Sequence, residues 1–288
     1  MKAAAVAHGA VTVVNAISTG KGAALGIDLW TSASVTLNDD PESLEVRIKP
    51  DPSENPELAR KVVGRILRRF GKEEEYGAKV QVDSNIPIAR GLKSSSAAAN
   101  AIALATVGAL DKRLPELEIV KLGVRAAIEA GVTITGAFDD ACASYFGNIL
   151  VTDNKKLKIE KAYHIKRHYE VLVHVPESKS YTADSNIERM MEIAPLIQVA
   201  HQQALRGNYW DAMCINGYAH SIALSYDPSI AMKALSAGAI ASGLSGKGPA
   251  VAAVVPSSKV DSVKAIWAQY PGRLLLATVN RKKAHIME

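Results

Sequence analysis

The stretch IPIARGLKSSSAAANAIALATVGAL (residues 86–110) places three serines and a lysine directly before a long run of small, helix-forming residues. Gly91 can adopt backbone angles that other residues avoid, and the alanines after the serines favour a helix. The first turn of a helix leaves N–H groups without intrahelical partners, and their partial positive charge attracts phosphate. Lys93 adds a full positive charge at the same place. Taken alone, the stretch is equally consistent with a closely packed helix capped by Ser94 to Ser96.

The elements around this stretch mix strands and helices. Alternating apolar and polar residues predict strands at 3–15, 25–37, 43–49, 78–88, 147–154, 169–176, 248–256 and 273–280. Helical spacing predicts helices at 57–70, from the serines onward, at 115–131 and at 258–269, and the chain beyond residue 180 is mostly helical before its last strands. A chain of 288 residues is long enough for two lobes. We therefore expect an α+β protein with lobes at 1–160 and 161–288.

The amino-acid composition limits the classes of protein to which this chain can belong. Hydrophobic residues make up 48% of the chain and charged residues 22%, which is typical of a globular protein. The N-terminal residues indicate a strand and not a signal peptide, and no apolar run reaches the roughly 18 residues that span a bilayer, so we expect a cytoplasmic protein without a membrane partner. The net charge of +5 suits small anionic substrates, because the basic residues are scattered and aromatic residues are only 5%, which disfavours nucleic acid. Cys142 and Cys214 are expected to be buried free thiols.

A second glycine-rich loop, SGLSGKGPAVAAV (residues 242–254), leads into a predicted strand. Its bare backbone can form a nest for an anion or bring two lobes close together. The lysines at 21 and 247 are each followed by glycine, whereas a P-loop requires serine or threonine there. The glycine pattern of a dinucleotide-binding fold is absent as well. We therefore expect neither a P-loop NTPase nor a dinucleotide-binding enzyme.

Acidic residues form the third feature. Asp139 and Asp140 lie side by side in TGAFDDACAS (residues 135–144), among small and apolar neighbours. At least one of them is expected in a semi-buried site, as a general base or a metal ligand. Glu129 ends its predicted helix, where the dipole disfavours a negative charge and a nearby cation would compensate for it.

These three motifs together resemble the GHMP kinase superfamily. PIARGLKSSSAAA is similar to its P-x-x-x-G-L-G-S-S-A-A phosphate loop, TGAFDDA to its acidic motif, and SGLSGKGPAVAAV to its C-terminal glycine-rich motif. The resemblance implies an N-terminal α/β lobe with a left-handed β-α-β crossover, against the usual handedness, and a ferredoxin-like C-terminal lobe. It also implies ATP and Mg²⁺ as cofactors.

The resemblance also implies roles for particular residues. Asp139 is the expected catalytic base, although Asp140 fills a position where relatives have an amide and remains an alternative. Lys93 replaces the usual glycine and is a candidate catalytic charge. Ser95 and Glu129 are the expected metal ligands. The residues expected to bind the nucleotide are Pro87, Ile88, Ala89, Arg90, Gly91, Leu92, Lys93, Ser94, Ser95, Ser96 and Ala97. The residues expected to bind the acceptor are Lys21, Asp139, Gly243 and Gly246.

Within the superfamily, AVAHGAVTVVNAISTGKGAALGID and TGAFDDACASYFGN resemble the archaeal type of shikimate kinase. This implies phosphorylation of the 3-hydroxyl of shikimate, a step of aromatic amino acid biosynthesis. Such an acceptor needs a cation for its carboxylate, and the candidates are Lys21, Arg90, Lys179 and Arg189, with His8 and Asn15 as further polar groups. Homoserine kinase or another small-alcohol kinase is the alternative, and a non-enzymatic protein that binds a small molecule or nucleic acid is a third. The oligomeric state stays open.

Overall fold

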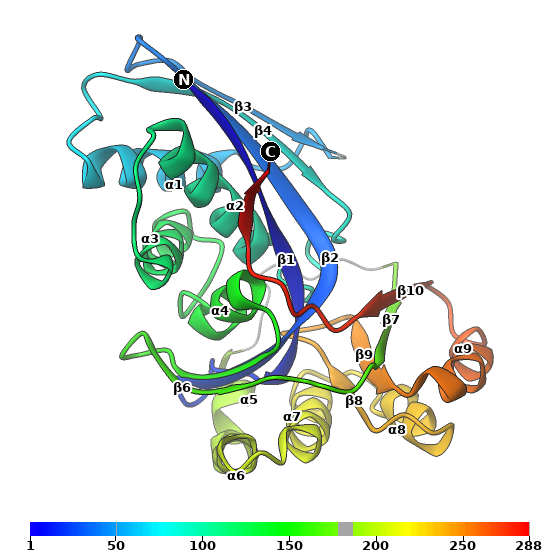
Figure 1. Cartoon of the computed structure of the whole chain (residues 1–288). Helices are drawn as coiled ribbons and strands as arrows, with labels where there is room; N and C mark the ends of the chain where they lie inside the picture. The colour runs from blue at the N-terminus through cyan, green and yellow to red at the C-terminus, as the bar shows by residue number, and fades with distance from the viewer. Residues whose placement is uncertain (50, 178–186, 288) are drawn as a thin grey trace.

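The computed structural model describes residues 1–49, 51–177 and 187–287. Figure 1 shows two lobes, each with a β-sheet covered by helices on one side. The first part of the chain forms β1 (Lys2–Val14), β2 (Lys21–Asn38), β3 (Leu44–Lys49), α1 (Glu57–Arg69), β4 (Gly77–Ser84), α2 (Ser94–Ala109), α3 (Glu116–Glu129), α4 (Phe138–Phe146), β5 (Ile149–Asp153) and β6 (Lys158–Tyr163). The second part forms β7 (Glu170–Val175), α5 (Ile187–Glu192), α6 (Ala194–Leu205), α7 (Tyr209–Ala223), α8 (Ser229–Ser236), β8 (Ala241–Leu244), β9 (Val251–Val255), the short 3₁₀ helix η2 (Ser257–Lys259), α9 (Val260–Trp267), β10 (Arg273–Thr278) and β11 (His285–Met287).

The first sheet has the strand order β11-β1-β2-β4-β3, with β5 paired to β2 and β6 to β5. Strands β3 and β4 are parallel and are joined through α1, as the expected β-α-β unit requires. Helices α1 to α4 cover one face of this sheet (Figure 1). Small residues such as Ala101, Ala103 and Ala105 make α2 almost entirely buried, so the helix can lie directly against β1 and β2.

The second sheet is antiparallel and has the order β10-β7-β9-β8, the order of a ferredoxin-like sandwich. One hydrophobic core joins the two lobes: it contains Val11 and Leu25 from the first sheet together with Val173 and Ala252 from the second. The lobes therefore hold each other in place through a shared apolar interior. Over the described residues, no helix is both long and apolar enough to cross a bilayer.

The α+β, two-lobed expectation is confirmed, and most predicted elements lie within a few residues of their observed bounds. Three strands escaped prediction, namely β6, β8 and β11. Strand β8 has only the four residues ASGL, and β11 has three exposed residues, so neither carries an alternating pattern of its own. Strand β11 follows the second sheet in the chain but pairs with β1 of the first sheet. Strand β6, which also belongs to the first sheet, ends at Tyr163. The lobe boundary near residue 160 stays a prediction. Both cysteines are free thiols, with Cys142 buried and Cys214 half-buried.

Candidate active site

The start of α2 is shaped to receive an anion. Lys93 occupies the N-cap position with a left-handed φ of 65°, and no side chain caps the helix. The alternative reading, in which Ser94 to Ser96 cap the helix, is therefore wrong: these serines form the first helical turn. A first turn without a capping side chain leaves its N–H groups for an external acceptor, and a phosphate is the acceptor that suits the helix dipole.

The phosphate loop is joined to the second glycine-rich loop by hydrogen bonds between the lobes. The Ser245 hydroxyl donates to the Gly91 carbonyl at 2.7 Å, and the backbone N–H of Thr12 donates to the same hydroxyl at 3.1 Å. The N–H of Gly246 in turn donates to the Thr12 hydroxyl at 2.8 Å. A Cβ atom at Gly91 would overlap the Ser245 carbonyl, so glycine is required for this approach. The two loops, 154 residues apart in sequence, thus form one wall of a cavity.

The cavity combines both loops with the acidic motif and with the segment before it. Its lining consists of Thr12, Asn15, Ala16, Ile17, Ala89, Gly91, Lys93, Ser94, Ser95, Ser96, Ala127, Val132, Thr133, Ile134, Thr135, Gly136, Ala137, Asp139, Asp140, Gly246, Lys247 and Gly248. Three motifs that are distant in sequence therefore meet at one place, as a phosphoryl-transfer site requires.

Lys93 links the helix start to the acidic pair. Its ammonium group lies 3.2 Å from Asp140 Oδ2, and the two side chains are only 8% and 14% exposed. Burial raises the pKa of Asp140, and the positive charge of Lys93 opposes that shift. Lys93 and Asp140 both line the cavity, so this ion pair holds Lys93 toward the cavity and not swung away from it.

Asp139 is the more deeply buried acid, at 3% exposure. It accepts a hydrogen bond from Asn154 Nδ2 at 2.7 Å. Burial and the charge of the adjacent Asp140 raise the pKa of Asp139 to about 7, although the bond from Asn154 and the charge of Lys93 lower it. A carboxyl group with a pKa near neutrality is suited to take and return a proton.

The remaining residues of the expected phosphate loop lie outside the cavity lining. Leu92 and Ala97 are buried in the apolar core, and Ile88 lies in a neighbouring groove. The Arg90 guanidinium donates to the backbone carbonyl of Glu177. Pro87, like these four, is not among the residues that line the cavity. The loop therefore presents Ala89, its glycine, its lysine and its serines to the cavity, while Leu92 and Ala97 anchor it in the core.

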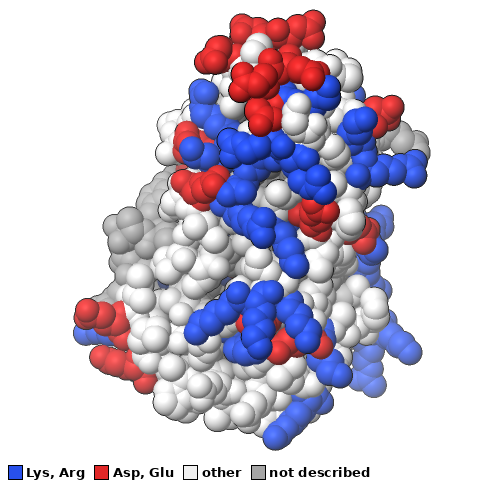
Figure 2. Space-filling view, turned by 90° about the vertical axis from the view of Figure 1, so that its left-hand side faces the viewer, with Lys and Arg blue, Asp and Glu red and all other residues white. Residues whose placement is uncertain are grey.

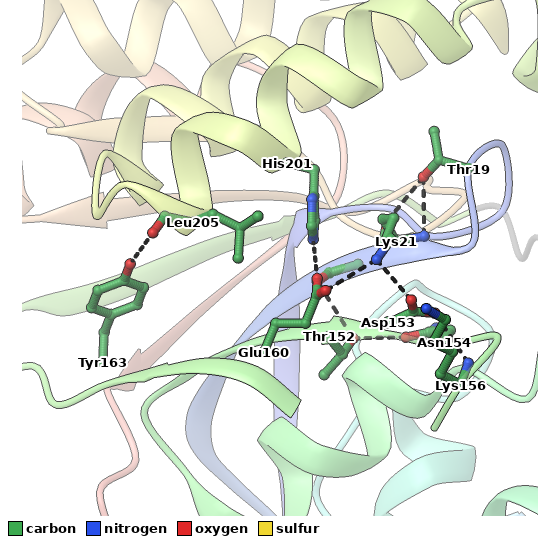
Figure 3. A network of polar contacts seen from close by, with 11 residues as sticks. Thr19, Lys21, Thr152, Asp153, Asn154, Lys156, Glu160, Tyr163, His201 and Leu205 are labelled. Carbon is green, nitrogen blue, oxygen red and sulfur yellow. Dashed lines mark hydrogen bonds and ion pairs between the residues drawn. The ribbon is translucent and has the colours of Figure 1, made fainter. Parts of the chain in front are cut away.

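The residues expected to bind the acceptor also include some that line the cavity and some that do not. Gly246 lines the cavity, whereas Gly243 packs against Gly217 of α7. Lys21 points away from the cavity and pairs with Asp153 at 2.7 Å and with Glu160 at 3.1 Å (Figure 3). The structure does not bring Lys21 or Gly243 to the acid pair.

The further polar candidates for the acceptor are scattered. Asn15 lines the cavity and donates to the Gly246 carbonyl at 3.0 Å. His8 is buried in β1 outside the lining, and Arg189 donates to the Ser225 hydroxyl. Lys179 lies outside the described residues. Sequence reasoning missed Thr12 and the segment 132–134, whose β-branched residues carry no distinctive signal.

The two expected metal ligands are separated. Ser95 lines the cavity, but Glu129 receives a hydrogen bond from Arg65 Nε at 2.9 Å and lies outside the lining. Arg65 lowers the pKa of Glu129 and is the compensating cation that the helix end required. The described residues contain no group of three or more His, Cys, Asp or Glu side chains that could enclose a metal. Ser95 fits a Mg²⁺ ion that is carried mainly by phosphate oxygens, and Glu129 does not.

On the face drawn in Figure 2, basic side chains of the described residues alternate with acidic ones. Figure 2 shows the helical face of the first lobe, where blue Lys and Arg side chains form a band between red acidic groups. Several of these cations are paired, including Lys61 with Glu57 and Arg69 with Glu118. Paired, interleaved charges make a weak field for a polyanion.

Comparisons with known proteins agree with this geometry. Residues 57–148 match the family described as GHMP kinases N terminal domain. The chain is 44% identical over 282 residues to a shikimate kinase of Methanosarcina mazei, covering 97% of this chain and 95% of that protein. It is 39% identical to a shikimate kinase of Pyrococcus furiosus, covering 93% and 96% of the two chains. The fold is similar to that of a homoserine kinase from Cytophaga hutchinsonii, with a TM-score of 0.77, 14% identity, and coverage of 99% and 97%.

Proposed function

We propose that this chain, which belongs to the GHMP kinase family together with the archaeal shikimate kinases it matches, transfers the γ-phosphoryl group of ATP to the 3-hydroxyl of shikimate. The products are shikimate 3-phosphate and ADP. The observation that carries the proposal is the meeting of the uncapped start of α2 with a buried acid pair in one cavity. The acceptor rests on the relatives, because every kinase of this fold needs the same phosphate-binding parts.

The residues around the phosphates act by alignment and by charge. A phosphoryl group passes through a loose transition state, so catalysis depends mainly on positioning and on neutralising its oxygens. The first-turn N–H groups of α2 and the ammonium of Lys93 face the cavity from one side. A magnesium ion would supply further positive charge at the phosphates, and the Ser95 hydroxyl would be its protein ligand.

Asp139 is our proposed general base. It lines the cavity, and its pKa of about 7 lets it accept the hydroxyl proton at neutral pH. A positioned base of this kind contributes about 10²–10⁴-fold in rate. Asp140 is the alternative: burial raises its pKa as well, but its ion pair with Lys93 opposes that shift and occupies one of its carboxylate oxygens.

An ADP-release assay with shikimate, homoserine, mevalonate and galactose as acceptors tests the proposed reaction. We expect turnover with shikimate, confirmed by mass spectrometry of the phosphorylated product. Turnover with homoserine alone would move the chain to the small-alcohol alternative. Absence of turnover with all four, together with salt-dependent binding of a polynucleotide, would favour a binding protein instead.

Two amide substitutions separate the acids. Asp139→Asn should abolish turnover while ATP still binds, and Asp140→Asn should retain measurable turnover. Asp83→Asn is the matched control, because Asp83 is an exposed aspartate in β4 outside the cavity. The reverse order of the two activities would make Asp140 the base.

A further inference from the structure

The end of β5 places two buried polar side chains beside Asp139. Thr152 is fully buried and Asn154 is 4% exposed. The Thr152 hydroxyl donates to Asn154 Oδ1 at 2.7 Å, and Asn154 Nδ2 donates to Asp139 Oδ1 at 2.7 Å. Neither residue lines the cavity, so neither touches a ligand there.

The order of donors fixes the side-chain amide of Asn154. The Thr152 hydroxyl donates to the amide oxygen of Asn154 and also lies 3.4 Å from the Gly22 carbonyl, which leaves the amide nitrogen to donate to Asp139. A flipped amide would place its oxygen against a carboxylate oxygen of Asp139. On another side, Asp139 packs against the backbone of Gly22, where a Cβ atom would come within 2.6 Å of the carboxyl carbon. The carboxylate is therefore held between an oriented donor and a bare stretch of backbone.

An ion-pair cluster stabilises the end of β5, from which Asn154 reaches Asp139. Figure 3 shows Lys21 between Asp153 and Glu160, with His201 of α6 above them. Lys21 and Asp153 are also cross-strand partners in the β2–β5 ladder. The backbone N–H of Asn154 donates to the Gly20 carbonyl at 2.9 Å, which continues the ladder by one residue. The cluster thus fixes the strand end from which Asn154 reaches the acid.

We propose that Asn154 is a positioning residue for catalysis: its amide, oriented by Thr152, holds the Asp139 carboxylate in its reactive rotamer and favours its ionised form. The proposal rests on the proposed phosphotransfer function and adds to it a residue outside the cavity. It deepens the role of Asp139 and requires no contact between Asn154 and the substrates.

Other titratable groups lie near Asp139 and also influence its ionisation. Asp140 on the same helix raises the pKa of Asp139, and Lys93 from the start of α2 lowers it. Cys142 is also close, and the charge of Asp139 contributes to raising the pKa of that thiol. None of these groups replaces the directed hydrogen bond from Asn154, because a charge at a distance does not fix a rotamer.

The pH profile of kcat/KM for shikimate tests the proposal. Asn154→Leu keeps the approximate shape of the side chain and removes the donor, so the acid limb should move upward by about one pH unit. We expect kcat near neutral pH to fall by about tenfold or more while the KM for ATP is unchanged, with recovery at higher pH. Thr152→Val should shift the limb in the same direction, and Thr152→Ser, which keeps the hydroxyl, should restore the wild-type profile.

Tyr163→Phe is the matched control. Its hydroxyl donates to the Leu205 carbonyl at 2.7 Å in the same region (Figure 3) but has no contact with Asp139. This variant should keep the wild-type pH profile. A purely structural role for Asn154 would lower the melting temperature without moving the acid limb, and that result would overturn the proposal.

A second readout is independent of the acceptor. Isotope-edited NMR of aspartate carboxyl carbons, with the signal assigned through Asp139→Asn, follows the ionisation of Asp139 directly. The midpoint should rise in Asn154→Leu and in Thr152→Val. An unmoved midpoint in both would reject the positioning role even if shikimate is the substrate. A raised midpoint in a protein that does not phosphorylate shikimate would instead reject the proposed acceptor and retain the positioning role.

Discussion

Replacing Gly91 with alanine tests the contact between the two glycine-rich loops. Gly91 has a φ of 84°, and a Cβ atom there would overlap the Ser245 carbonyl oxygen and lie 3.1 Å from its carbon. Gly71 is a matched control, because its φ is 63° and nothing lies within 4 Å of the position of a Cβ atom. Both substitutions therefore carry the left-handed backbone penalty, and only Gly91→Ala adds the overlap.

The magnitudes separate the two variants. The left-handed conformation costs an alanine about 1–2 kcal/mol in either position. At Gly91 the Ser245 backbone must also retreat by roughly 1 Å, and the hydrogen bond from the Ser245 hydroxyl to the Gly91 carbonyl is lost, at about 1 kcal/mol more. Each kcal/mol lowers the melting temperature of a chain of this size by about 2–4 °C. Gly91→Ala should therefore melt about 2–4 °C below Gly71→Ala.

Activity should separate them further. A misplacement of about 1 Å in catalytic geometry can cost about 100-fold in rate. We expect kcat/KM for ATP to fall by ten- to about 100-fold in Gly91→Ala and to stay at the wild-type value in Gly71→Ala. Calorimetry and coupled ADP-release kinetics provide the two measurements. Equal melting temperatures and equal kcat/KM values would show that the loop contact is irrelevant to the site.

Three further substitutions address the charges of the site. Lys93→Met removes the cation 3.2 Å from Asp140, so the KM for ATP should rise by about tenfold or more, and ATP titration checks this. Asp139→Asn should raise the melting temperature above neutral pH but not at about pH 4. The folded-state pKa of Asp139 is raised from 3.8 to about 7, so between these pH values the folded protein keeps a proton that the unfolded chain releases. The wild type therefore loses stability as pH rises from about 4 through about 7, and Asn at this position does not. A melting-temperature difference independent of pH would contradict this. Glu129→Gln should leave the Mg²⁺ titration unchanged and cost less than about 1 kcal/mol, since its pair with Arg65 is partly exposed. A weakened Mg²⁺ response would return Glu129 to the metal site.

The sequence was informative wherever a local pattern controls the backbone. The alternation in SLEVRIK predicted β3, and apolar spacing predicted α1 to within one residue. Strand β11 could not be found in this way, because three exposed residues become a strand only when β1 lies beside them. The same holds for β8, whose glycine and serine form a strand against β9 and α7.

The residues of the site could likewise be predicted where a local sequence pattern identifies them, but not where contacts between distant segments decide their role. The phosphate loop and the acid pair could be predicted from the sequence because they contain residue types, such as adjacent carboxylates among apolar residues, that cost free energy unless they serve a function. Glu129 was correctly expected to need a cation, but the sequence could not show that Arg65 of α1 supplies it. A metal ion and an arginine satisfy the same electrostatic requirement, and only the packing of α1 against α3 decides between them.

The segment STGKGAA shows how a correct physical inference can name the wrong partner. Lys21 was expected to bind the acceptor because it lies between two glycines, where the backbone can approach another group. In the structure the approaching group is the Asp139 carboxylate, and the residue it approaches is Gly22. Successive side chains of a strand point to opposite faces, so Lys21 must point away from the acid and toward Asp153. The strand therefore contributes to the acid from both faces: the glycine makes room for Asp139, and the lysine secures the strand end that carries Asn154.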